Sequence, residues 1–293
     1  PAIIPQDELD MEALANLLDA ADAQSKHAPL VAQYRDWIDA QHQKCRGLSH
    51  KRHATARQML DAAAQAADRI EAGIALLADP DILTAFRLAN RTMAAAARHR
   101  AAQIEGGSPA SLAPPRWRPF QLAYILLTLR GVADPLHAER EIVDLLFFPT
   151  GGGKTEAYLG LAAFILVLRR LRNPGLRGAG VSVLMRYTLR LLTLDQMSRA
   201  ATLICALELE REHDARLGPW PFEIGLWVGQ AATPNRLGRK GYDGPGKDDT
   251  AYLKTNRFKR DPRRYPRPIP LENCPWCGTE LEPDSFRLAP NPN

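Results

Sequence analysis

The stretch Phe148-Pro-Thr-Gly-Gly-Gly-Lys-Thr155 carries the strongest signal in the sequence. It follows an apolar run of strand length, residues 142–148, and precedes a helical pattern over residues 154–172. A glycine-rich turn between a strand and a helix points several backbone N–H groups at one place, and glycine is needed where a phosphate approaches closely. We therefore predict a nucleotide-binding loop, with a purely structural glycine turn as the alternative.

Each part of this loop has an expected role. The residues predicted to surround the nucleotide phosphates are Thr150, Gly151, Gly152, Gly153, Lys154 and Thr155. Lys154 is placed to reach the β and γ phosphates of ATP, and the Thr155 hydroxyl is placed to hold Mg²⁺, so these two are the predicted catalytic residues. Glu156 stands in the first turn of the helix, where it complements the helix dipole as readily as it would serve catalysis.

After the loop, apolar runs typical of strands alternate with segments whose apolar residues follow the helical period. Residues 180–185 and 222–228 are apolar runs of strand length, and a helical pattern covers residues 190–213 between them. Strand, helix, strand, helix, strand is typical of a parallel sheet wound with crossover helices. The sequence therefore predicts an α/β fold around the phosphate loop.

The residues before the loop have a different composition. Residues 7–104 are rich in alanine with apolar residues at steps of three and four, and Asp79-Pro80 has the N-cap and first-turn proline of a new helix. Proline and glycine then break the pattern. The predicted division is a helical N-terminal domain at 1–104, a linker at 105–119, a partial first ATP-binding domain at 120–235, a basic loop at 236–270 and half of a zinc-binding module at 271–293.

Composition excludes several classes of protein. The chain has 293 residues, of which 45% are hydrophobic and 24% charged, as in ordinary globular proteins. The longest apolar run, residues 157–168, is shorter than a membrane-spanning helix, and no secretory signal is visible. Four cysteines do not make a disulfide framework, so we expect a cytoplasmic, reducing environment.

Positive charge is concentrated in one segment. Residues 236–267 contain eleven Lys and Arg against four Asp, a local charge of +7, which leaves −2 for the rest of a chain whose net charge is +5. Aromatic residues alternate with these cations, a composition that fits a nucleic-acid surface. A solvated, mobile loop is the alternative that this segment leaves open.

Cys274-Pro-Trp-Cys277-Gly has the spacing of half a zinc ribbon. Zn²⁺ is therefore a predicted cofactor, with Cys274 and Cys277 as ligands, and a free dithiol turn is the alternative. Since the sequence begins without Met and ends soon after these cysteines, we expect a part of a longer protein that supplies two further ligands. A second group, His42, Cys45, His50 and His53, is interpreted as a polar face.

With the loop written Pro149-Thr-Gly-Gly-Gly-Lys-Thr155, the chain resembles superfamily 2 helicases and translocases, whose first motif reads Pro-Thr-Gly-x-Gly-Lys-Thr. Further stretches, at residues 85–93, 118–124 and 147–160, resemble the helicase-like component of the DISARM antiphage defence system. The resemblance covers most of residues 70–280. It implies a partial RecA-like P-loop motor domain, preceded by the helical domain and followed by the zinc-ribbon half.

The resemblance also assigns roles to single residues. Gln121 would read the adenine edge, with Phe120 or Trp117 available to stack, although a helix surface amide is the alternative. Arg186, Thr188 and Arg190 would contact the DNA backbone, with a structural ion-pair cluster as the alternative. An acidic strand-end motif and an arginine finger, which hydrolysis requires, are absent from this sequence.

These observations favour an ATP-dependent DNA translocase or helicase of superfamily 2. The resemblance adds phage DNA as the target and a DrmB-like protein as the partner. A non-enzymatic DNA-binding scaffold with a regulatory or vestigial nucleotide site is the alternative from another class. A P-loop ATPase acting on proteins or small molecules is disfavoured by the basic segments.

Overall fold

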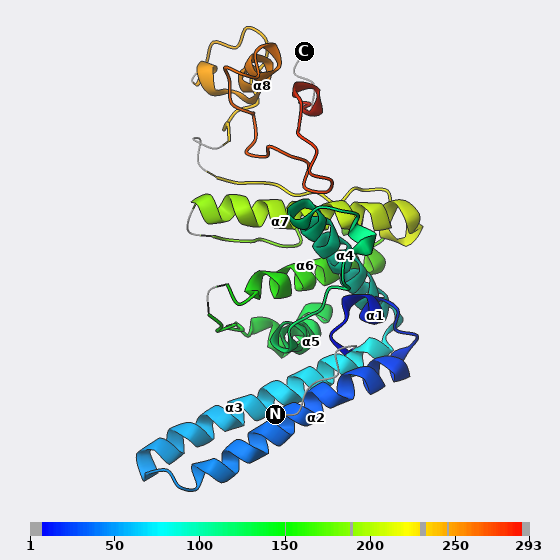
Figure 1. The fold of residues 1–293 in the computed structure, drawn as a ribbon, viewed down its shortest axis with the longest axis vertical. Helices are drawn as coiled ribbons and strands as arrows, with labels where there is room; N and C mark the ends of the chain where they lie inside the picture. Colours follow the sequence, from blue (N-terminus) through cyan, green and yellow to red (C-terminus); the bar gives the residue numbers. More distant parts are fainter. Residues whose placement is uncertain (1–7, 150, 188–189, 229–232, 245, 289–293) are drawn as a thin grey trace.

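The computed structural model describes residues 8–149, 151–187, 190–228, 233–244 and 246–288, and Figure 1 shows their arrangement. The α-helices are α1 (Met11–Ala15), α2 (Ala20–Cys45), α3 (His50–Ala75), α4 (Pro80–Glu105), α5 (Pro119–Ala133), α6 (Lys154–Arg172), α7 (Arg190–His213) and α8 (Ala251–Arg260). Among the described residues, no helix combines the length and the apolar content needed to cross a membrane. The helices predicted over 154–172 and 190–213 are confirmed.

The predicted α/β fold, and with it the RecA-like domain with a parallel sheet, is wrong. The described residues contain no sheet, and their β-type pairings are isolated bridges between Asp10 and Arg116, Arg236 and Thr250, and Asn273 and Glu280. The segments predicted as strands, 142–148, 180–185 and 222–228, run as irregular chain without a ladder. The architecture is therefore almost entirely helical.

The physical reason lies in what covers these segments. A buried parallel strand has side chains packed on both of its faces, whereas Val143, Phe147 and Trp227 are 93%, 88% and 98% exposed. Helix α6 packs against α4 and α5, so its apolar face is covered by helices. An apolar run of strand length does not reveal whether another strand pairs with it or a helix covers it. For that reason the sequence pattern wrongly predicted a sheet.

Helix α4 is the centre of the packing. Asp79 is its N-cap and accepts hydrogen bonds from the N–H groups of Asp81 (2.8 Å) and Ile82 (3.1 Å), as the sequence predicts. Its buried residues occupy more than one face and include several alanines, which let neighbouring helices approach closely. Helices α1, α6 and α7 all pack against it.

One cluster of buried apolar side chains extends from α1 through α7, and residues on both sides of 105–119 belong to it. Phe86 of α4, Leu126 of α5 and Phe164 of α6 are among its most deeply buried members. The domain division expected from the sequence remains a prediction. The packing adds that the helices on the two sides of 105–119 bury their apolar faces against one another.

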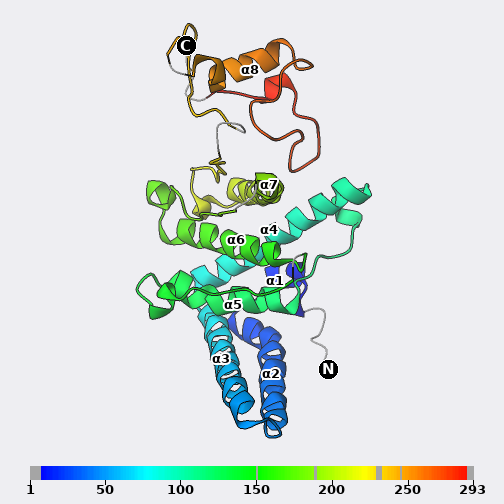
Figure 2. The same cartoon turned by 90° about the vertical axis from the view of Figure 1, so that its left-hand side faces the viewer.

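Helices α2 and α3 form an antiparallel hairpin that projects from the body (Figures 1 and 2). Its base is fixed by α3, which packs against α5. Arg69 of α3 donates to both carboxylate oxygens of Asp144 (2.6 and 2.9 Å) and to Glu139 (3.2 Å). Hydrogen bonding to Asp144 raises the pKa of Arg69, and this partly buried ion pair lies at the base of the hairpin.

Gly73 generates a prediction about this base. A Cβ atom at Gly73 would lie 1.9 Å from the carbonyl oxygen of Leu126, so α3 and α5 touch through their backbones. Although alanine has the better helix propensity by about 1 kcal/mol, we expect Gly73→Ala to lower the free energy of unfolding by about 1–3 kcal/mol through overpacking. Urea denaturation measures this change.

The matched control is Gly47→Ala, because nothing lies within 4 Å of a Cβ built at Gly47. That substitution should leave the midpoint of urea denaturation unchanged or raise it slightly. A Gly73→Ala protein as stable as the parent would contradict the close contact.

Candidate functional site

The described residues of the predicted phosphate loop, 148–155, form a tight turn that requires glycine. Gly151 and Gly153 have positive φ angles of 81° and 85°, which glycine adopts without strain. The N–H of Gly152 donates to the Pro149 carbonyl oxygen over 3.0 Å and closes a tight turn. A Cβ at Gly152 would lie 2.9 Å from the Phe148 ring, so the turn also requires glycine for lack of space.

The start of α5 supports this loop from one side. Arg118 Nη1 donates to the Gly152 carbonyl oxygen (2.8 Å), and Gln121 Nε2 donates to the Gly153 carbonyl oxygen (2.6 Å). The C=O and N–H of a trans peptide point in opposite directions. The N–H groups of Gly153 and Lys154 are therefore turned away from α5, toward the open side of the loop.

Gln121 is fixed at both ends of its amide. Its Oε1 accepts from the Arg118 N–H (2.7 Å) while its Nε2 holds the loop, and only 3% of the residue is exposed. A Cβ at Gly153 would lie 2.7 Å from this Nε2. The structure thus places Gln121 beside the glycine turn, buried and in a positioning role, rather than as the surface amide that was the alternative; its predicted contact with adenine remains a prediction.

The first turn of α6 begins directly at the glycine loop. Its N-cap is Gly153, and no side chain accepts a capping hydrogen bond there, while Glu156 is the acidic residue of its first turn. The Lys154 ammonium donates to the carbonyl oxygens of Phe148 and Pro149. An amine held by two neutral carbonyls can exchange them for phosphate oxygens, and an uncapped helix start offers N–H donors to the same anion.

Glu156 has a structural partner. Its carboxylate is ion-paired with Arg199 of α7, which joins α6 to α7 beside the loop. Burial lowers the pKa of Arg199. The interpretation of Glu156 as the catalytic base loses support from this arrangement, because its carboxylate already neutralises a half-buried cation.

Trp117 and Phe120, the two candidates for stacking on adenine, differ in how accessible their rings are. Trp117 is 2% exposed, and its indole N–H donates to Asn90 Oδ1 over 2.7 Å, so its ring is enclosed in the core. Phe120 stacks on Phe148 with ring centroids 3.9 Å apart at the rim of the loop. Phe148 occupies the position at which the eight-residue phosphate-loop template has glycine, and this stack explains how its ring is accommodated.

The predicted DNA contacts are only partly described. Arg186 is exposed on the irregular segment that leads into α7. Arg190 is the first residue of α7, while Thr188 and, in the phosphate loop, Thr150 lie outside the described residues. Contacts of these residues with DNA remain predictions.

The segment around Cys274 and Cys277 folds as a compact turn. The N–H of Cys274 donates to the Thr279 carbonyl oxygen (2.8 Å), and the N–H of Gly278 donates to the Cys274 carbonyl oxygen (2.9 Å). Cys277 Sγ lies 3.2 Å from the Thr279 hydroxyl, and the hydrogen bond between these two side chains lowers the pKa of Cys277. The lowered pKa favours the thiolate of Cys277, the form that binds metals.

This turn is docked on α4 and α7. His99 stacks on Trp276 with centroids 3.5 Å apart, and Gln103 Nε2 donates to the Trp276 carbonyl oxygen over 3.0 Å. From α7, the Thr202 hydroxyl donates to the Pro275 carbonyl oxygen over 2.9 Å. Burial raises the pKa of nearby Cys205, and no three His, Cys, Asp or Glu residues of the described chain form a group that could hold a metal.

The basic segment is more ordered than the sequence suggests. Thr250 caps α8, which sequence reasoning missed, although the three-residue spacing of Thr255 and Phe258 is a helical signal. Lys254, Arg257 and Arg267 are ion-paired with acidic residues. The remaining exposed cations, which form no ion pair with an acidic residue of the described chain, are Arg236, Arg239, Lys240, Lys247, Lys259, Arg260, Arg263 and Arg264.

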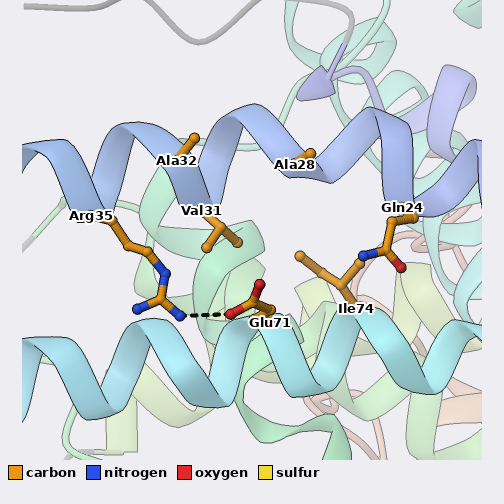
Figure 3. Close-up of a pocket in the computed structure, with 7 residues that line it drawn as sticks. All are labelled: Gln24, Ala28, Val31, Ala32, Arg35, Glu71 and Ile74. Carbon is orange, nitrogen blue, oxygen red and sulfur yellow. Dashed lines mark hydrogen bonds and ion pairs between the residues drawn. The ribbon is translucent and has the colours of Figure 1, made fainter.

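A separate pocket of about 240 Å³ lies between α2 and α3 (Figure 3). Alanine side chains, Val31 and Ile74 form much of its wall, and Arg35 pairs with Glu71 across it. Its volume is below the roughly 300–1,000 Å³ of typical small-molecule sites. It lies in the hairpin, whereas the phosphate loop joins α5 to α6.

The support of the loop by Gln121 generates a prediction. We expect Gln121→Ala to accelerate amide hydrogen exchange about fivefold at Gly152, whose N–H is bonded to the Pro149 carbonyl oxygen, because the loop loses one supporting hydrogen bond worth about 1 kcal/mol. Gln103→Ala is the matched control and should leave exchange at Gly152 unchanged. Equal exchange at Gly152 in the parent and the Gln121→Ala protein would contradict the support.

Comparison with known proteins agrees with the resemblance described above. No protein-family profile matches the chain. The chain is 44% identical over 172 residues to DISARM protein DrmA of Bacillus paralicheniformis, an alignment that covers 56% of this chain and 14% of that protein. The chain therefore spans about a seventh of its relative's length. Over the aligned residues, it is a homologue of DISARM protein DrmA.

Proposed function

We propose that this chain supplies the ATP-binding loop and part of the DNA-contacting surface of an ATP-dependent DNA translocase or helicase of superfamily 2 in antiphage defence. The observation that carries the proposal is the supported loop at 151–155. Its carbonyls are held by α5, its N–H groups face outward, and it leads into an uncapped helix. Homology to DISARM protein DrmA supports the place in defence.

Within this proposal, the residues divide the work of binding. Main-chain N–H groups of Gly153 and Lys154 bind phosphate oxygens, and the Lys154 ammonium moves from the loop carbonyls to the β and γ phosphates. Thr155 holds Mg²⁺, which supplies charge neutralisation at the transferred phosphoryl group when it is bound. Arg118 and Gln121 keep the loop in place, and an adenine ring can reach the stacked pair of Phe120 and Phe148.

DNA contacts complete the proposal. Arg186, Thr188 and Arg190 contact the phosphate backbone of DNA at the start of α7, which follows α6 in the chain. The exposed cations of the basic segment, among them Lys259 and Arg263, provide a second basic region. Phage DNA is the proposed target and a DrmB-like protein the proposed partner.

One observation favours the alternative of a DNA-binding scaffold with a regulatory nucleotide site. Glu156 is the acidic residue that directly follows the loop, and it is committed to Arg199. A scaffold binds ATP without turning it over, whereas a motor hydrolyses ATP faster when DNA is present. Turnover with and without DNA therefore separates the two functions.

We expect Lys154→Ala in the intact protein to reduce DNA-stimulated ATP hydrolysis about 100-fold or more, because it removes a positioned charge from the transferred phosphoryl group. Phosphate release measured with and without DNA tests this. Lys26→Ala, at a lysine of α2 far along the chain from the loop, is the control and should retain full turnover. Unchanged activity in Lys154→Ala would remove the proposal.

A zinc site at Cys274 and Cys277 is a further part of the proposal, since two thiolates fill half of a tetrahedral shell. We expect Cys274→Ser and Cys277→Ser each to reduce bound zinc in the purified intact protein, measured by elemental mass spectrometry. Cys45→Ser should leave the zinc content unchanged. Full zinc content in both variants of the turn would refute the site.

A further inference from the structure

The free end of the α2–α3 hairpin has an unusual distribution of charge. Residues 42–57 contain five Lys and Arg and no Asp or Glu. The cations are Lys44, Arg46, Lys51, Arg52 and Arg57, and all five are exposed. We call residues 42–57 the hairpin tip.

The rest of the hairpin has the opposite balance. Residues 19–41 hold four Asp against one Lys and one Arg, and residues 58–75 hold two Asp and one Glu against one Arg, so each segment carries −2. Toward the base, Arg35 pairs with Asp68 (2.8 Å) and Glu71 (2.6 Å). In the part of the chain that the structure describes, none of the five tip cations has such a partner.

The tip charges do not serve the stability of the hairpin. Helix α3 has no acidic residue in its first turn and no side-chain cap from Ser49, while Lys51 and Arg52 stand at the positive end of its dipole. Cations at a helix N-terminus are unfavourable, and like charges gathered at one end repel each other. A partner with dense negative charge would relieve both effects.

The shape of the tip indicates which anionic partner fits. At about 100° per residue, Lys51, Arg52 and Arg57 point in three different directions around α3. They therefore surround a narrow end, which suits phosphates spaced along a strand or duplex. A lipid surface would instead favour a broad apolar face beside the cations, and Leu48, 40% exposed, is the large apolar residue exposed within the described tip.

We propose that the hairpin tip binds the phosphate backbone of nucleic acid. The inference rests on the proposed action on DNA and adds a contact at the end of the molecule opposite α8 (Figure 1). Helices of 26 residues reach about 39 Å along their axes. The tip thus engages nucleic acid at a distance from the phosphate loop, without reading its sequence.

The test replaces Lys44, Arg46, Lys51 and Arg52 with glutamine in the intact protein. DNA affinity is measured by fluorescence anisotropy across a series of salt concentrations. We expect at least tenfold weaker binding at low salt, and a slope of log K against log salt that is shallower by about 0.9 for each duplex phosphate that the tip no longer neutralises. Circular dichroism melting and ATP turnover without DNA should match the parent.

Arg46→Lys together with Arg52→Lys is the matched control, because it keeps the charge and should keep both affinity and slope. The tip proposal is overturned if the glutamine variant binds DNA like the parent, or if it loses binding only to polyglutamate or to vesicles of phosphatidylcholine and phosphatidylserine. A parent protein that binds no DNA overturns the proposed function as well, so the two failures are distinguishable.

Discussion

The hydrogen bond from the Trp117 indole to Asn90 Oδ1 lies where the three helices on which the candidate site depends meet. Asn90 belongs to the central helix α4, and Trp117 precedes Arg118, the N-cap of α5. In α6, a Cβ at Gly160 would lie 2.6 Å from the Trp117 ring, so glycine lets α6 approach. Because Arg118 and Gln121 follow Trp117 in the chain, this buried junction sets the position of the groups that hold the phosphate loop.

Local features of the sequence predicted local structure well. Asp79-Pro80 marked the start of α4, and the glycine-rich stretch predicted a turn leading into the helix that begins at Lys154. Long-range contacts were not predictable in the same way, since the reach of Arg118 to the loop depends on how α5 packs. The sheet prediction failed because an apolar run such as 142–148 contains no information about whether another strand pairs with it.

The molecule has an apolar middle, where the helices pack, and a basic region at each end. The middle, where α4 to α7 pack, holds the predicted phosphate loop and the docked cysteine turn. The two basic regions, the hairpin tip and the segment around α8, lie at opposite ends (Figures 1 and 2). Such a layout lets a polyanion contact the ends while the central helices keep an apolar core, because desolvated cations would be costly within it.

The exposed irregular segments have a practical consequence for the isolated polypeptide. Extended chain with unpaired backbone groups and apolar side chains is a template for intermolecular β-aggregation. Asp144 acts as a gatekeeper in the segment 142–148, since a charge interrupts the apolar run and its tie to Arg69 holds the segment against α3. Loss of this ion pair would release the apolar segment 142–148 from α3. The isolated polypeptide would then aggregate more readily, and a low protein concentration would be needed to keep it monomeric.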